Sequence, residues 1–138
     1  MLESVITQRV RYGETDKMGV VYYGNYLVWF EVGRTHHFRT RGVTYAEIEA
    51  AGLFLPVSEV SCKILQPARY DDEVQIRTSL AEIRSRALTL AYRIESGGNL
   101  LAEGKTVHVC VNGEQKVTKI PDWIRAKLDI EQRTLRPQ

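Results

Sequence analysis

Residues 25–42, NYLVWFEVGRTHHFRTRG, form the stretch that decides the fold. Asn25 is suited to cap the start of a helix, and Gly42 is suited to follow its end. Between them, four residues at helical spacing share one face: Tyr26, Phe30, Gly33 and His37. The segment therefore predicts one helix of about four to five turns.

This predicted helix is apolar on more than one side. Its large apolar residues do not keep to a single stripe: Tyr26, Leu27, Trp29, Phe30 and Phe38. Such a helix must be buried by something that curls around it. Gly33, in the middle, costs about 1 kcal/mol relative to alanine, so we expect it to allow close packing against a strand.

The residues around the helix predict a sheet. A first strand is expected at residues 4–12, which are rich in β-branched residues. The second half of the chain predicts four more strands: 56–65, 73–83, 87–96 and 100–112. Short turns at 97–99 (GGN) and 112–113 (NG) make consecutive strands antiparallel. The predicted class is α+β, with one long helix and a five- to six-stranded antiparallel sheet.

Two shorter helices complete this prediction. Residues 44–47 (TYAE) have the capping-box pattern of a helix start, and Gly52 ends that helix. Residues 121–130 are expected to form a last helix before a polar tail at 131–138. Because there is no repeat and no linker-like stretch, residues 1–138 are expected to form a single domain.

Composition argues against several classes of protein. The 138-residue chain is 43% hydrophobic and 26% charged, as in a globular domain. A net charge of +2 is too mild for a nucleic-acid binder. No apolar run approaches the ~20 residues of a membrane span, and the first residues do not resemble a signal peptide. Cys62 and Cys110 make no disulfide framework, so we expect a reducing, cytoplasmic location.

The densest chemical signal is residues 12–26, YGETDKMGVVYYGNY. Asp16 lies in a turn-rich loop between the first predicted strand and the long helix. Unpaired N–H groups and the positive end of the dipole at a helix start can stabilise an oxyanion. A carboxylate beside them can attack a carbonyl or deprotonate a water that attacks it. Asp16 and Gly19 also fit an ordinary type I turn, and the tyrosines also fit a core or an interface.

The spacing of this segment resembles one protein family. Its pattern, Tyr-x-x-Thr-Asp-x-x-Gly-Val-Val-Tyr-x-x-x-Tyr, is similar to that of the 4-hydroxybenzoyl-CoA thioesterases. That family includes the small acyl-CoA thioesterases encoded beside the bacterial Tol-Pal system. Residues 66–73 (QPARYDDE) and 101–104 (LAEG) match it as well. The resemblance implies a hotdog fold and hydrolysis of an acyl-CoA thioester without a metal or an organic cofactor.

The resemblance also implies roles within the motif. Asp16 matches the catalytic carboxylate, acting as nucleophile or as general base. Tyr23 falls where the family offers a backbone N–H to the thioester carbonyl, and Gly24 and Asn25 are expected to contact the substrate. Tyr12 matches an aromatic residue that orients the carboxylate. In the Tol-Pal group position 23 is commonly histidine, so tyrosine keeps the main-chain amide but puts a side-chain acid–base role in doubt.

Two further places carry expectations about the substrate. Glu31 falls where the hydroxybenzoyl enzyme has an acidic residue near the hydroxyl of the acyl ring; an exposed helical glutamate is the alternative. Arg84, Ser85 and Arg86 lie at an expected turn, where basic residues of the family meet the CoA phosphates, often from a neighbouring subunit. A solvated hairpin turn is the alternative there.

The resemblance implies an assembly, because hotdog proteins pair sheet edges between subunits and place their sites at the dimer interface. We expect a homodimer at least, and a homotetramer as the fuller assembly. Two other interpretations stay open. One is a non-catalytic hotdog module that binds acyl-CoA or protein partners. The other is a hotdog hydratase or dehydratase, although the motif of those enzymes is not found.

The histidines and cysteines predict no other chemistry. His36 and His37 are adjacent, so they point about 100° apart on a helix and cannot share a metal ion. Cys62 and His108 are a conceivable nucleophile–base pair on neighbouring strands. A buried structural cysteine is the more common case in such strands.

Overall fold

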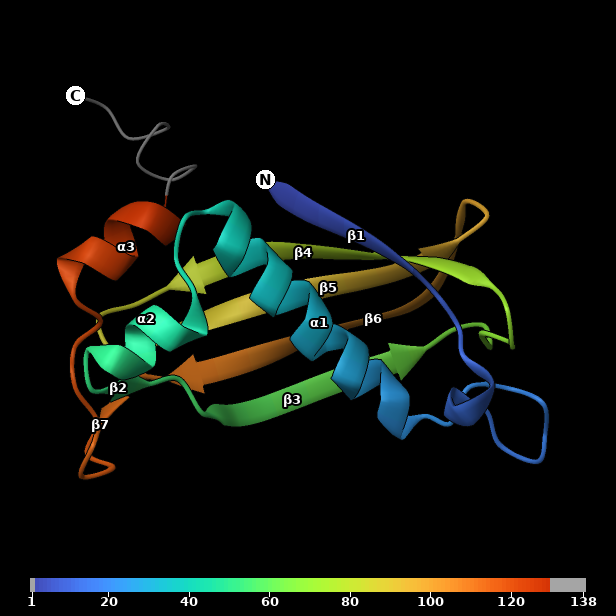
Figure 1. Ribbon diagram of the computed structural model, residues 1–138, viewed down its shortest axis with the longest axis horizontal. Coiled ribbons are helices and arrows are strands. Elements are labelled where there is room, and N and C mark those ends of the chain that lie inside the picture. The colour runs from blue at the N-terminus through green and yellow to red at the C-terminus, as the bar shows by residue number, and fades with distance from the viewer. Residues whose placement is uncertain (1, 130–138) are drawn as a thin grey trace.

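The computed structural model describes residues 2–129. They form a five-stranded antiparallel sheet with helix α1 (Gly24–Thr40) lying across one face (Figure 1). In sheet order the strands are β1 (Glu3–Arg9), β4 (Glu73–Ile83), β5 (Ala87–Ser96), β6 (Asn99–Val109) and β3 (Val57–Ile64). The other elements are η1 (Tyr12–Glu14), α2 (Tyr45–Ala50), β2 (Leu53–Phe54), β7 (Val111–Asn112) and α3 (Asp122–Leu128). The predicted α+β class is confirmed.

Helix α1 turns its large side chains toward the sheet. Those that are buried are Tyr26, Trp29, Phe30, His37 and Phe38. Phe30 stacks on Tyr92 of β5, with ring centroids 4.2 Å apart. A Cβ added to Gly33 would come within 3.0 Å of the side chains of Thr78 and Ile76 on β4. The predicted close packing of this glycine against a strand is therefore confirmed.

The hairpin between β5 and β6 also follows the prediction. Gly97 and Gly98 form its turn with positive φ angles of 57° and 82°. A two-residue turn with positive φ at both positions matches the right-handed twist of the strands it joins. At the start of α2, the Thr44 side chain accepts a hydrogen bond from the amide of Glu47, as the capping pattern predicts.

Two predicted boundaries near α1 are wrong. The first strand ends at Arg9 rather than at residue 12, because the backbone of Val10 pairs with the loop at residues 71–72 instead of continuing along β4. The N-cap position of α1 is Tyr23, whose side chain makes no capping hydrogen bond, so Asn25 is not the N-cap. The side chain of Asn25 instead turns back toward the preceding loop.

The last long strand is shorter than predicted. The range 100–112 divides into β6 and β7, separated at Cys110. β7 leaves the main sheet and pairs with β2, which the alternation of Val107, Val109 and Val111 did not indicate. α3 lies within the predicted range 121–130, and the predicted polar tail lies outside the described residues.

The two ends of α1 have different surroundings. The loop that holds Asp16 lies at its N-terminal end, whereas α2, β2 and β7 lie toward its C-terminal end (Figure 1). The turn between β4 and β5 belongs to this second end, since Ile120 donates a hydrogen bond to the carbonyl of Ser85 at 2.9 Å. None of the described helices has both the length and the apolar character needed to span a membrane.

Candidate active site

The loop between η1 and α1 is a narrow, hydrogen-bonded turn. The amide of Asp16 donates to the carbonyl of Val20 at 2.9 Å, and Gly19 donates to the carbonyl of Asp16 at 3.0 Å. Gly19 has a φ of +79°, a conformation that favours glycine. Val21 donates to the carbonyl of Ala68 at 2.8 Å, which fixes the loop to the segment after β3.

The carboxylate of Asp16 is exposed at the tip of this loop. Its Oδ1 accepts a hydrogen bond from the amide of Met18 at 2.8 Å. Within the described residues, Oδ2 receives no hydrogen bond. The turn predicted from Asp16 and Gly19 is therefore present, and it holds one carboxylate oxygen while leaving the other open to a ligand.

The start of α1 has open backbone donors beside the loop. Asn25 and Tyr26 donate to the carbonyls of Tyr22 and Tyr23, at 2.9 and 3.2 Å. In the part of the chain that the structure describes, the amides of Tyr23 and Gly24 donate no hydrogen bond, and no side chain caps the helix. Such uncapped N–H groups at the positive end of a helix dipole suit an anionic oxygen.

Glu14 connects the segment before the Asp16 loop to the start of α1. Its role was not predicted from the sequence. Its side chain is buried, and its Oε1 accepts a hydrogen bond from the amide of Arg11 at 2.7 Å. Its Oε2 accepts from the indole Nε1 of Trp29 at 2.8 Å. Its carbonyl accepts from the side-chain amide of Asn25 at 2.8 Å and from the amide of Tyr22 at 2.9 Å. One residue therefore ties η1 to the first turns of α1.

Three tyrosines of the motif, Tyr12, Tyr22 and Tyr23, lie on the surface around the loop, whereas Tyr26 is buried. Tyr12 is 77% exposed, and its ring meets the edge of Tyr70 at a centroid distance of 5.6 Å. Tyr23 is 67% exposed and lies against Tyr22, with centroids 4.6 Å apart. A single chain leaves these aromatic rings uncovered, so they are available to a ligand or to a second subunit.

The predicted substrate residues do not all meet at this loop. Glu31 is exposed and lines a shallow groove between α1 and β1. Arg84, Ser85 and Arg86 form the β4–β5 turn at the other end of α1, where Arg125 donates to the carbonyl of Arg84 at 2.6 Å. The structure therefore brings Tyr12, Asp16, Tyr23, Gly24 and Asn25 together in one chain, but it does not bring the arginine turn to them.

Two histidines, His37 and His108, are buried and hydrogen-bonded within the core. Nδ1 of His37 is hydrogen-bonded to Ser4 at 2.7 Å. His108 has both ring nitrogens occupied, at 2.9 Å from the carbonyl of Leu55 and 2.8 Å from Thr106, which argues against pairing with Cys62. Among residues 2–129, no three histidine, cysteine or acidic side chains lie close enough together to bind a metal ion.

Known structures share this fold. A structure from Thermus thermophilus, the hypothetical protein TT1821, superposes with a TM-score of 0.89 and 43% identity over 92% of this chain and 98% of its own. The DHNA-CoA thioesterase of Staphylococcus aureus superposes with a TM-score of 0.89 and 29% identity over 100% of this chain and 98% of its own. Both the predicted hotdog fold and the wider family resemblance are thereby confirmed.

Sequence relatives lead to the same family. The acyl-CoA thioester hydrolase YbgC of Escherichia coli O157:H7 is 32% identical over 105 residues, which are 75% of this chain and 78% of that protein. The family model of the thioesterase-like superfamily matches residues 10–128, a range that includes the Asp16 loop, α1 and every strand of the sheet except β1. This chain belongs to the thioesterase-like superfamily.

Proposed function

We propose that this chain is an acyl-CoA thioesterase, which hydrolyses a CoA thioester to a free acid and CoA. The observation that carries the proposal is the junction between the Asp16 loop and α1. A carboxylate with one uncommitted oxygen precedes a helix start with two open amides. The acyl-CoA thioester hydrolase among its relatives supports the same reaction class.

In this mechanism the amides of Tyr23 and Gly24 bind the thioester carbonyl oxygen and stabilise the developing oxyanion. Asp16 acts in one of two ways. As a nucleophile it attacks the carbonyl carbon, the CoA thiolate leaves and takes up a proton, and water then hydrolyses the mixed anhydride. As a general base it removes a proton from the water that attacks the carbonyl. Neither route uses a metal or an organic cofactor.

The neighbouring residues fit supporting roles. By the family resemblance Tyr12 is assigned to orient the carboxylate, and Tyr23 to contribute its main-chain amide, since the histidine common in the Tol-Pal group is absent. Asn25 supports the site by holding the carbonyl of Glu14. Glu31, two turns along α1, is positioned to meet a polar group of the substrate only if the acyl group extends along the helix.

We assign the CoA phosphates to the β4–β5 turn. Arg84, Ser85 and Arg86 offer two guanidinium groups and a hydroxyl, and Lys119 and Arg125 line the same shallow pocket with Arg84 and Ser85. Guanidinium groups bind phosphate through paired, charge-assisted hydrogen bonds. Because this turn lies at the other end of α1 from Asp16, it would serve a site on another subunit.

Strand β3 supplies an edge for such a subunit. Along its outer side it pairs with no other strand of the described chain, and Val57, Val60 and Ile64 are 44%, 50% and 45% exposed. An unpaired edge with apolar side chains is a template for pairing with a second copy. We propose a homodimer through β3, and a homotetramer built from two such dimers. Light scattering that finds only a 15.8 kDa species would contradict this.

A cytoplasmic location fits this chemistry. Cys62 is half-buried, Cys110 is buried, and neither forms a disulfide. Free thiols persist where the surroundings are reducing. We therefore propose an intracellular pool of acyl-CoA as the source of substrate.

The Asp16→Asn variant tests the catalytic assignment. Asparagine keeps an oxygen for the Met18 amide, so the loop is retained while the negative charge is lost. We expect kcat on a panel of short, long and aromatic acyl-CoAs to fall by at least about 100-fold. Asp71→Asn is the matched control, since Asp71 is an exposed turn residue with a positive φ that asparagine tolerates.

The same panel separates the alternatives. A wild-type protein that binds acyl-CoA but hydrolyses none of the panel is a binding module. Consumption of an enoyl-CoA with CoA still attached would identify a hydratase. After a single turnover in oxygen-18 water, label in Asp16 supports the nucleophilic route, and label in the free acid alone supports the general-base route.

A further inference from the structure

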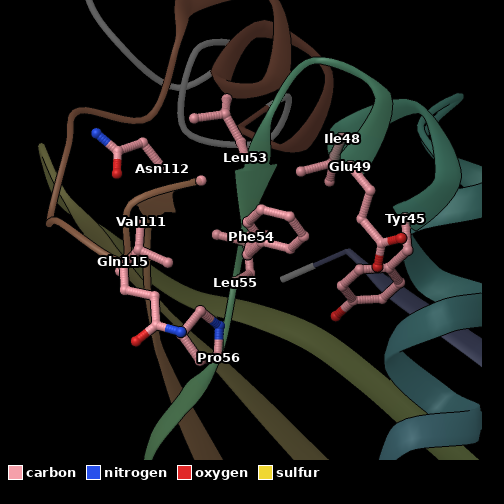
Figure 2. A pocket seen from close by; sticks show the side chains of 11 residues that line it. Tyr45, Ile48, Glu49, Leu53, Phe54, Leu55, Pro56, Val111, Asn112 and Gln115 are labelled. Carbon is pink, nitrogen blue, oxygen red and sulfur yellow. The ribbon is translucent and has the colours of Figure 1, made fainter.

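A pocket lies at a distance from the Asp16 loop, toward the C-terminal end of α1. It has a volume of about 690 Å³, opens to solvent on one side and is lined by side chains of α2, the 53–56 segment and the chain around β7 (Figure 2). Its apolar wall consists of Ile48, Leu53, Phe54, Leu55 and Val111. This size and this mainly apolar lining are typical of pockets that bind small molecules.

The wall of this pocket is held in place from behind. The carbonyl of Leu55 accepts a hydrogen bond from Nδ1 of His108 at 2.9 Å. Nε2 of His108 then accepts from the hydroxyl of Thr106 at 2.8 Å, and Tyr92 is hydrogen-bonded to Thr106 at 2.5 Å. All three side chains are buried. A buried and satisfied hydrogen-bond chain holds the Leu55 part of the wall in place.

The charge of the pocket limits what it accepts. Among the described residues, Glu49 is the one carboxylate on its wall, and none of the described lysines or arginines lines it. A ligand group with its own carboxylate would meet repulsion from Glu49, and no described lysine or arginine is part of the wall to offset it. The lining therefore suits a neutral, apolar group.

The pocket is remote from the catalytic carboxylate of its own chain. It lies toward the C-terminal end of α1, and Asp16 lies before the N-terminal end (Figure 1). The 17 residues of α1 span about 25 Å at 1.5 Å per residue. A thioester bound at Asp16 is therefore at the opposite end of the helix from this pocket.

In a two-fold dimer paired through β3, the pocket of one copy comes close to the Asp16 loop of the other. β3 begins just after the pocket residues Leu55 and Pro56, and it ends just before residues 65–68, which bind the Asp16 loop through the hydrogen bond from Val21 to Ala68. When two copies of a strand pair about a two-fold axis they run antiparallel, so the start of one lies beside the end of the other. The pocket of one copy then lies next to the Asp16 loop of the second copy.

We infer that the pocket of α2, β2 and β7 binds the neutral, apolar acyl group of a thioester whose carbonyl is held at Asp16 of a second copy of the chain. This inference rests on the proposed thioesterase function and extends it. In a site at the dimer interface, the pocket is then the part that the second chain supplies. It also excludes acyl groups that end in a carboxylate from the preferred substrates.

Pocket variants test the acyl assignment. Leu53→Trp fills the pocket, and we expect kcat/KM for bulky neutral acyl-CoAs to fall by about 10- to 100-fold while that for acetyl-CoA changes little. Phe54→Ala, at a residue that is 41% exposed and so tolerates truncation, should shift preference toward larger acyl groups. Ala46→Trp is the matched control, because Ala46 is exposed on α2 and does not line the pocket.

Mixed dimers test whether the pocket serves the other chain. Asp16→Asn has an intact pocket, and Leu53→Trp has an intact carboxylate. After the two are unfolded together and refolded in equal amounts, half of the dimers are mixed and each holds one complete site, so about a quarter of the wild-type rate on a bulky acyl-CoA should return. If the pocket served its own chain, no mixed dimer would contain a complete site and the rate would not rise above that of the parent proteins.

The outcomes separate the two levels of the proposal. A wild-type protein that hydrolyses no thioester overturns the proposed function itself. A wild-type protein that is active, with an acyl-group profile unchanged in Leu53→Trp and Phe54→Ala, overturns only the pocket assignment. A wild type that prefers succinyl-CoA or glutaryl-CoA to neutral acyl groups of similar length overturns the predicted substrate class.

Discussion

The carboxylate of Glu14 accepts a hydrogen bond from the indole Nε1 of Trp29 at 2.8 Å, and both side chains are buried. The contact joins the segment before the Asp16 loop to the second turn of α1. The Glu14 carbonyl also receives the Tyr22 amide, so Glu14 helps to fix the position of the loop, together with the hydrogen bond from Val21 to Ala68. Glu14 therefore contributes to the position of the Asp16 carboxylate relative to the start of α1.

Replacing Glu14 with alanine should damage both stability and catalysis. The change leaves the Arg11 amide and the Trp29 indole without acceptors. Each such unsatisfied donor costs about 1–3 kcal/mol of stability. We expect the free energy of unfolding in urea to fall by about 2–4 kcal/mol. Glu47→Ala, an exposed glutamate on α2, is the control. Comparison with Trp29→Phe and the double variant should give a coupling energy; purely additive losses would contradict the anchor role.

Gly33→Ala should destabilise the protein although alanine favours helices. Alanine gains about 1 kcal/mol in helix propensity, but its Cβ would come within 3.0 Å of Thr78 and Ile76. Overpacking of this kind costs about 1–3 kcal/mol, so we expect a net loss in urea unfolding. At Gly113 an added Cβ meets nothing within 4 Å. Gly113→Ala should therefore stay within about 0.5 kcal/mol of wild type.

Much of this fold can be predicted from sequence because its signals are local. The turn at Gly97 and Gly98 needs positive φ at two positions, and glycine at both positions predicts such a turn. Gly33 in an aromatic helix likewise indicates a close strand. Asp16 is exposed in a turn that its own neighbours define, so the turn and the motif are both visible in the sequence.

Other features depend on contacts between distant segments and leave no local pattern. Val10 continues the β-branched run of the first strand, yet its backbone pairs with residues 71–72, so the strand stops early. In the sequence Glu14 resembles an ordinary polar loop residue, because its hydrogen bond with Trp29 joins residues 15 positions apart. The arginine turn and Asp16 lie at opposite ends of α1, and nothing in their spacing along the chain reveals that separation.

Acid should destabilise the protein partly through His37. Burial, with help from the charges of Arg41 and His36, lowers the pKa of His37 to about 4. Since the pKa of an unfolded histidine is about 6.5, the unfolded chain binds the proton more readily between these values. Stability is then full above pH 6.5 and declines as pH falls toward 4, by about 2–3 kcal/mol. Urea unfolding at pH 7.5 and 4.5 measures this loss, and His37→Gln should reduce it; an unchanged pH dependence would exclude His37 as the cause.

Arg84→Ala and Arg86→Ala should weaken binding of CoA without slowing the chemical step. If these side chains hold the phosphates, each charge-assisted contact contributes about 1–2 kcal/mol, so KM for an acyl-CoA should rise by about 5- to 30-fold while kcat changes little. The same acyl group on pantetheine has no nucleotide phosphates, and its KM should be the same in wild type and variants. Arg93→Ala serves as the control, because Arg93 is exposed on β5 and paired with Glu95 at 2.8 Å. An equal rise in KM for the pantetheine substrate would show that the turn acts on the structure of the site rather than on the phosphates.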